Sequence, residues 1–166
     1  MTLRNAVILI AVAATLAPQG MTGGNPSTHA VDDTPRIVSA AGMTTNVTVT
    51  RDEISLNGAW DFTPLDGSVN PGVKTTIRVP DEWDALPGFH DATTGVYERA
   101  VFIPASWSGR AVFLEIYEAN WHVDLAVNGA VFPRVSEGIG IPTNVDVTSA
   151  VNFWLNNTFR VTVTQA

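Results

Sequence analysis

The chain has 166 residues, of which 45% are hydrophobic and 15% charged, and its formal net charge at pH 7 is −7. This composition supplies enough apolar side chains for one folded domain and excludes a disordered chain. The acidic balance, without any cluster of Lys and Arg, argues against a nucleic-acid partner. The absence of Cys excludes disulfides, thiolate metal sites and cysteine nucleophiles.

The N-terminus has the pattern of an export signal. Arg4 gives a short basic start, and Ala6–Ala17 is an apolar run of signal-peptide length, too short to span a bilayer as a helix. We therefore predict a signal-peptide helix and leader over residues 1–30, with cleavage between residues 17 and 30. The protein would then be exported, to the periplasm or the extracellular space, and have no stable membrane span. A membrane anchor or a buried helix is the alternative.

A linker follows the leader, and short strands follow the linker. Residues 31–45 are predicted to be the linker, because this part of the chain is rich in Gly, Pro, Ser, Thr and Asp and has no apolar period. The folded domain is predicted over residues 46–166. Its first strands are indicated by alternation over Asn46–Thr50, by the pair Trp60 and Phe62, and by Thr75–Val79 before a proline.

The second half of the chain carries longer strand patterns. Asn128 and Gly129 form the dipeptide typical of a type I′ hairpin turn, which predicts a return strand over Ala130–Val135. The other predicted strands are Val96–Ile103, Ala111–Tyr117, Val123–Val127, Val145–Thr148 and Phe159–Thr164. After residue 20 the sequence has no helical period of ten or more residues. The fold class is therefore all-β, with about eight or nine antiparallel strands in a sandwich or barrel.

Five segments, in this order, resemble the N-terminal sugar-binding domain of family 2 glycoside hydrolases, the group of β-galactosidase, β-glucuronidase and β-mannosidase. The first resembles the family's LNG-x-W-x-F opening, the second its VP-x-x-W segment, and the third its G-x-x-W-Y-x-R-x-F-x-V-P strand. The fourth is similar to the run that ends in V-x-V-N-G, and the fifth to E-G-G-x-x-P-F-x-x-D-V-T. These segments are Ile54–Phe62, Ile77–Asp84, Gly95–Pro104, Ala119–Val131 and Glu137–Thr148. The sequence departs from the pattern at Val96, Ile139 and Thr143.

The resemblance implies a jelly-roll, galactose-binding-like sandwich that lacks the last part of the family's domain. It also implies a parent enzyme that hydrolyses O-glycosidic bonds in carbohydrate metabolism, with an immunoglobulin-like domain and a TIM barrel that holds two catalytic glutamates. A barrel of about 250 residues does not fit within this chain. The chain alone is therefore expected to be an inactive scaffold domain whose partners are a carbohydrate and the parent enzyme's other domains.

The carboxylates of the chain do not by themselves indicate a glycosidase. A retaining enzyme needs two carboxyl groups about 5–5.5 Å apart. Asp81, Glu82 and Asp84 form one acidic cluster and Glu115 and Glu118 a second. We interpret both as solvated or turn-forming groups, with no catalytic residue among them.

Other chemistries leave no motif. His29, His90 and His122 are dispersed, and no G-x-S-x-G elbow accompanies them. Their spacing matches no metal site, and the sequence has neither a phosphate loop nor a dinucleotide fingerprint. We therefore expect no metal and no cofactor.

Sugar contacts are expected where a loop tryptophan has polar neighbours, because sugars combine apolar faces with hydroxyl groups. For each tryptophan, packing in the β core is the competing interpretation; Trp60 is assigned to the core, and Trp107 to a lid or the end of the sandwich. The candidate carbohydrate-binding residues are Trp83, Asp84, His90, Asp91, Asn120, Trp121 and His122.

Two alternative functions stay open. The chain could be a self-standing secreted carbohydrate-binding module, which would present an exposed aromatic platform. It could also be a structural or adhesion sandwich without affinity for sugars, since short strands alone do not distinguish these classes.

Overall fold

A computed structural model describes residues 9–15, 51–119, 122–136 and 141–165 of the chain. Its regular elements are ten antiparallel strands and two short 3₁₀ helices, so the prediction of an all-β fold is confirmed. The strands are β1 (Leu9–Thr15), β2 (Arg51–Ser55), β3 (Gly58–Pro64), β4 (Thr75–Val79), β5 (Thr94–Ile103), β6 (Ala111–Glu118), β7 (His122–Val127), β8 (Ala130–Ser136), β9 (Thr143–Asp146) and β10 (Leu155–Thr164). The helices are η1 (Trp83–Ala85) and η2 (Ala105–Trp107).

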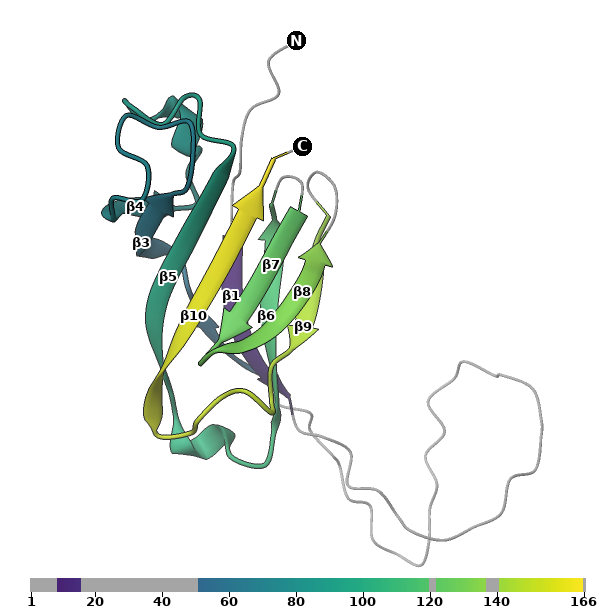
Figure 1. Ribbon diagram of the computed structural model, residues 1–166. Helices are drawn as coiled ribbons and strands as arrows, with labels where there is room; N and C mark the ends of the chain where they lie inside the picture. The colour runs from purple at the N-terminus through teal and green to yellow at the C-terminus, as the bar shows by residue number, and fades with distance from the viewer. Residues whose placement is uncertain (1–8, 16–50, 120–121, 137–140, 166) are drawn as a thin grey trace, which may run out of the picture.

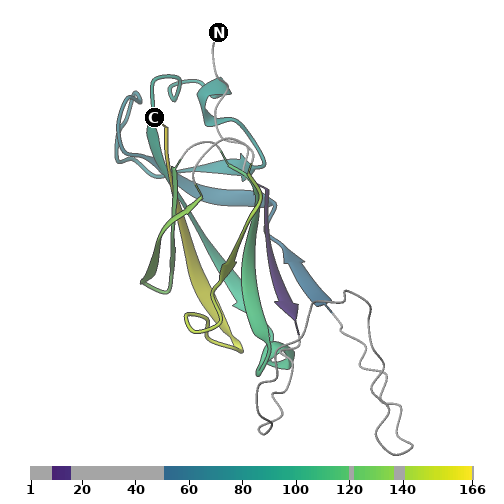
Figure 2. The same cartoon turned by 90° about the vertical axis from the view of Figure 1, so that its right-hand side faces the viewer.

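The strands form two sheets packed face to face (Figures 1 and 2). The larger sheet has the order β4-β3-β5-β10-β7-β8, and the smaller has the order β2-β1-β6-β9. In β3, β4, β7 and β10 alternate side chains are buried between the sheets, as the period of two requires. The core is built mainly from aromatic and β-branched residues, including Trp60, Phe62, Tyr97, Val112, Leu114, Leu125, Phe159 and Val161.

The hairpin predicted at Asn128 and Gly129 is confirmed. Both residues have positive φ angles, 50° and 87°, and β8 returns against β7 with Val127 opposite Ala130. Asn128 also donates from its side-chain amide to the carbonyl of Ala150 at 2.8 Å. The turn therefore joins two strands and also holds the loop before β10.

The opening motif of the domain has a structural reason. The carbonyl of Leu56 accepts hydrogen bonds from the indole N–H of Trp60 at 2.8 Å and from the guanidinium of Arg99 at 2.6 Å. Gly58 has a φ of 120°, which side-chain-bearing residues rarely adopt. The motif thus turns the chain from β2 into β3 and fixes Trp60 in the core, as its alternation with Phe62 predicted.

The N-terminal apolar run differs from the expected helix. Residues Leu9–Thr15 form β1, which pairs antiparallel with β2 on one side and with β6 on the other. An apolar run of this length is compatible with a strand as well as with a signal-peptide helix. The presence of hydrogen-bonding partners on both sides favours the strand in this structure. Removal of the segment on export stays a prediction, and so do the domain boundaries. The predicted strand Asn46–Thr50 lies outside the described residues, and the first strand after it begins at Arg51.

Candidate functional site

Two loops lie side by side at the end of the sandwich where β5 begins (Figure 1). Residues 65–74 join β3 to β4, and residues 80–93 join β4 to β5. The carboxylate of Asp66 accepts hydrogen bonds from the backbone N–H and hydroxyl of Thr93, at 2.7 and 2.5 Å, and from the N–H of Thr94 at 2.9 Å. Burial raises the pKa of Asp66, but these hydrogen bonds to its charged form outweigh burial and hold the pKa below its usual value. Asp66 therefore connects the loops through its ionised form.

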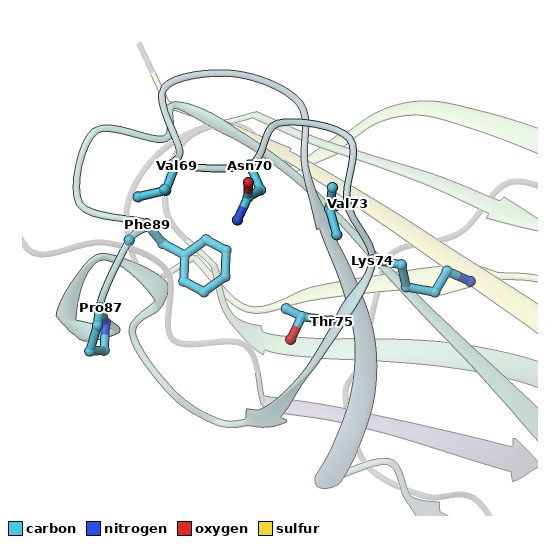
Figure 3. A pocket seen from close by; sticks show the side chains of 8 residues that line it. Val69, Asn70, Val73, Lys74, Thr75, Pro87 and Phe89 are labelled. Atoms are coloured by element: carbon cyan, nitrogen blue, oxygen red, sulfur yellow. The ribbon is translucent and has the colours of Figure 1, made fainter.

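A shallow pocket of about 210 Å³ opens between these loops, smaller than typical pockets for drug-sized ligands. Figure 3 shows the ring of Phe89 among the side chains that line it. Phe89 packs edge-on against Phe62 of the core, with ring centroids 5.6 Å apart. Lys74 points away from the pocket, and its ammonium group contacts the carboxylates of Asp61 and Glu98 at 3.3 and 3.2 Å. The full lining is Val69, Asn70, Val73, Lys74, Thr75, Pro87, Gly88 and Phe89.

Trp83, the first candidate for a sugar platform, is 0% exposed. Helix η1 turns its ring inward, where it stacks on Tyr97 with centroids 6.0 Å apart and contacts Phe62 at 5.3 Å. Gly95 makes room for this cluster, because a Cβ at that position would lie 2.4 Å from the ring of Phe62. Trp83 therefore does not face a ligand in this structure. It packs in the core, which was the competing interpretation.

The polar candidates near Trp83 are only partly brought together. His90 and Asp91 are exposed and line a second depression with Gly67 and Ser68. Asp84 is half-buried and lines neither this depression nor the pocket of Figure 3. The structure thus leaves His90 and Asp91 accessible to a ligand, without an aromatic ring from Trp83 beside them.

The remaining candidates belong to the connection between β6 and β7. His122 is the first residue of β7, is half-buried, and lies opposite Thr164 of β10. Strand β10 separates β7 from β5, so about 10 Å lies between the ends of β7 and β5. Asn120 and Trp121 lie outside the described residues. Their role as sugar contacts stays a prediction.

The carboxylate Glu115 is buried and engaged by other side chains. It forms an ion pair with Arg51, and it accepts a hydrogen bond from the hydroxyl of Tyr117 at 2.8 Å. The ion pair links β6 to β2 across the intervening strand β1. Glu115 is therefore a paired strand residue and not the solvated or turn-forming group that the sequence predicted.

The buried Tyr97 hydroxyl is poorly suited to proton transfer. Burial, together with the charge of Asp81, raises the pKa of Tyr97 well above its usual value. The hydroxyl therefore stays protonated at neutral pH. Among the described residues no group of three or more His, Cys, Asp and Glu side chains is arranged to hold a metal ion.

Sequence reasoning missed the most exposed tryptophan of the described chain. Trp154 is 68% exposed, and its ring lies beside Phe102, which is 49% exposed. Both lie at the end of the sandwich opposite the pocket of Figure 3, where β5 ends and β10 begins (Figure 1). The signal in the sequence was the apolar triplet Phe153-Trp154-Leu155 between asparagines, in the connection between the predicted strands Val145–Thr148 and Phe159–Thr164, where apolar residues are unusual.

The comparisons with known proteins rest on structure alone. No protein-family model matches the sequence, and no curated protein sequence matches it. The fold is similar to β-D-glucuronidase of Dictyoglomus thermophilum, with a TM-score of 0.57 and 22% identity over 66% of this chain and 19% of that chain. It is also similar to the Ruminococcus gnavus β-glucuronidase, with a TM-score of 0.56 and 19% identity over 66% of this chain and 20% of that one.

A third structure extends the pattern. The Bifidobacterium dentium β-glucuronidase, solved with coumarin-3-O-glucuronide, matches with a TM-score of 0.55 and 23% identity over 66% of this chain and 19% of that one. The chain thus spans about a fifth of the length of these β-glucuronidases. The resemblance noted in the sequence is confirmed at the level of the fold. No helix in the described parts of the chain is long and apolar enough to cross a bilayer.

Proposed function

We propose that the chain is the carbohydrate-binding scaffold domain of an exported glycoside hydrolase related to family 2, and that it supplies no catalytic residue. The observation that carries this proposal is the fold, which matches one fifth of three β-glucuronidases. The ordered motifs from Ile54 to Thr148 point the same way. The parent enzyme would hydrolyse O-glycosidic bonds with a catalytic barrel, and an immunoglobulin-like domain would lie between the sandwich and the barrel.

The loop end of the sandwich offers a surface for a neighbouring domain. Leu65, Val69 and Val73 of the first loop are 50%, 76% and 58% exposed, which is unusual for three apolar residues in one loop. Docking of the parent enzyme's other domains against this loop would cover them. His90 and Asp91 in the adjacent loop would then border the interface and could contact a substrate.

Export is part of the proposal and rests on the apolar run Ala6–Ala17. Residues Leu9–Thr15 of this run also form β1 between β2 and β6. A segment that is removed on export cannot also complete the sheet in the mature protein. N-terminal sequencing of the secreted protein therefore decides which of the two roles the segment has.

The experiment that tests the scaffold role is the mass of the native product, detected with an antibody against residues 54–160. A band far above the 17.7 kDa of this chain supports the proposal. A band at or below 17.7 kDa overturns it and favours a self-standing carbohydrate-binding module, which the exposed Trp154 would suit. The purified chain should also release no p-nitrophenol from p-nitrophenyl β-glucuronide or β-galactoside; measurable release contradicts the absence of catalytic residues.

A further inference from the structure

The exposed aromatic pair at the end of the sandwich contains the one described tryptophan that is not buried. Trp60, Trp83 and Trp107 are all buried, whereas Trp154 has most of its surface in solvent. Its ring meets that of Phe102 at an interplanar angle of 63°, with the centroids 6.1 Å apart. The two rings thus form a continuous apolar surface, which we call the Trp154 platform.

The backbone holds Trp154 in a costly conformation. Its φ is +66°, a left-handed value that is unusual for any residue with a side chain and a genuine outlier for a bulky one. The backbone N–H of Trp154 donates to the carbonyl of Ile103 at 2.7 Å, which fixes the turn against the end of β5. Such strain is often found at functional sites, where the surrounding structure maintains it.

A buried amide maintains this turn. Asn157 is fully buried, and its side-chain oxygen accepts hydrogen bonds from the backbone N–H of Asn152 at 2.6 Å and from the amide of Asn128 at 2.7 Å. Its side-chain nitrogen donates to the carbonyls of Asn152 and Leu155 at 2.8 and 3.0 Å. The loop before β10 is therefore tied down on both sides of Trp154, and the platform is preorganised.

The segments that carry the platform are polar but uncharged, and the first charged pair on the same face of the sheet, Glu98 and Arg160, lies further along β5 and β10. Residues 100–109 and 147–159, which form this end of the sandwich, contain no Asp, Glu, Lys, Arg or His. Asn156 lies opposite Phe102 in the strand register, and Thr158 lies opposite Ala100; all four residues are exposed and share the outer face of the sheet. Amide and hydroxyl groups beside an exposed indole match the hydroxyl groups and the apolar face of a neutral sugar ring.

We propose that the Trp154 platform is a carbohydrate-binding site that stacks an uncharged sugar ring on the indole of Trp154, with Phe102 at the side of the sugar and Asn156 hydrogen-bonded to its hydroxyl groups. This inference rests on the proposed carbohydrate-binding function and names the site and class of ligand. The platform lies away from Trp83, His90 and Asp91, at the opposite end of the β strands (Figure 1). The segments that carry the platform contain no Lys or Arg to pair with the carboxylate of a uronic acid, so a neutral sugar is the ligand class that fits.

The test is titration of the full chain with the β-1,4-linked hexasaccharides of glucose, xylose and mannose, and with hexagalacturonate as the charged probe. Binding is followed by calorimetry in the wild type and in Trp154→Gly, Trp154→Tyr and Val131→Ala. Glycine accepts the left-handed φ, so Trp154→Gly removes the ring without adding strain. Val131, which is 70% exposed on β8, provides the matched control.

The wild type is expected to bind at least one neutral hexasaccharide and to bind hexagalacturonate more weakly. Trp154→Gly should weaken binding about tenfold or more, since a central aromatic ring carries much of the energy of such a contact. Trp154→Tyr should stay within about threefold, because it retains an aromatic face. Val131→Ala should bind like the wild type.

Several results would overturn the inference. If the wild type binds none of the three neutral hexasaccharides, the platform is not a sugar site, while the scaffold role still depends on the native mass alone. If the wild type binds and Trp154→Gly binds equally well, the sugar site lies elsewhere and the carbohydrate-binding function survives. A concentration-dependent dimer that Trp154→Gly abolishes, without any sugar binding, would assign the platform to a second copy of the chain instead.

Discussion

Replacement of Asn157 by alanine should destabilise the domain through the loop that carries Trp154. The side chain makes four hydrogen bonds while fully buried. At about 1 kcal/mol for each, their loss would cost about 4 kcal/mol. Asn152 and Asn128 are exposed, so water can replace part of the lost bonding. We therefore expect the free energy of unfolding to fall by about 2–3 kcal/mol.

Urea unfolding followed by circular dichroism measures this change. With a slope of about 1–3 kcal/mol per molar urea, the midpoint should fall by about 0.7–3 M. The matched control is Asn156→Ala, the exposed neighbour, which should change the free energy of unfolding by less than about 0.5 kcal/mol. Asn157→Asp distinguishes the acceptor from the donor of the amide. It keeps the accepting oxygen and replaces the nitrogen that donates to the carbonyls of Asn152 and Leu155. It should be at least as destabilising as alanine, since it also buries a charge.

A loss below about 0.5 kcal/mol in Asn157→Ala would refute the reasoning. It would mean that the loop before β10 is held by its other contacts, which are the bond from Trp154 to Ile103 and the bond from Asn128 to Ala150. The preorganisation of the Trp154 platform would then need another source.

Three further predictions concern other parts of the sandwich. Gly95→Ala should lower the free energy of unfolding by about 1–3 kcal/mol in urea titrations, because the added Cβ would clash with the ring of Phe62. Unchanged stability would mean that the aromatic rings move aside without cost. Asp66→Asn should be less stable than the wild type at neutral pH, and the gap should narrow as the pH falls below about 4. The reason is that the pKa of Asp66 is lowered on folding, so its stabilisation is present above its unfolded pKa and is lost as the pH falls through the folded value. A gap that does not depend on pH would contradict this. A chain that starts at residue 46 and so lacks Leu9–Thr15 should unfold at lower urea and self-associate in sedimentation, because β2 and β6 lose the strand that pairs with both. Equal stability and a monomer would show that β1 is dispensable.

Local sequence patterns were sufficient to predict the features that depend on neighbouring residues, namely the turn and the buried face of a strand. The dipeptide Asn128-Gly129 required positive φ angles and produced the predicted hairpin. Alternation along Val123–Val127 placed the apolar side chains on one face, and the structure buries Val123, Leu125 and Val127. The sandwich class followed from such strands, because a one-sided apolar strand must pack against a second layer.

Non-local contacts decided the remaining features. The run Ala6–Ala17 was apolar enough for a signal-peptide helix, but pairing with β2 and β6 makes Leu9–Thr15 a strand in the structure. Trp83 lies among acidic residues in the sequence, which predicted contact with a ligand, but its ring packs against Tyr97 and Phe62 in the core. Trp154 has the opposite outcome, because a left-handed turn fixed by Asn157 turns it outward. The sequence by itself determined the strands from β3 to β10 and which of their faces are apolar, since both depend on neighbouring residues. Only the tertiary structure decided which tryptophans meet solvent, because burial depends on side chains that lie far apart in the chain.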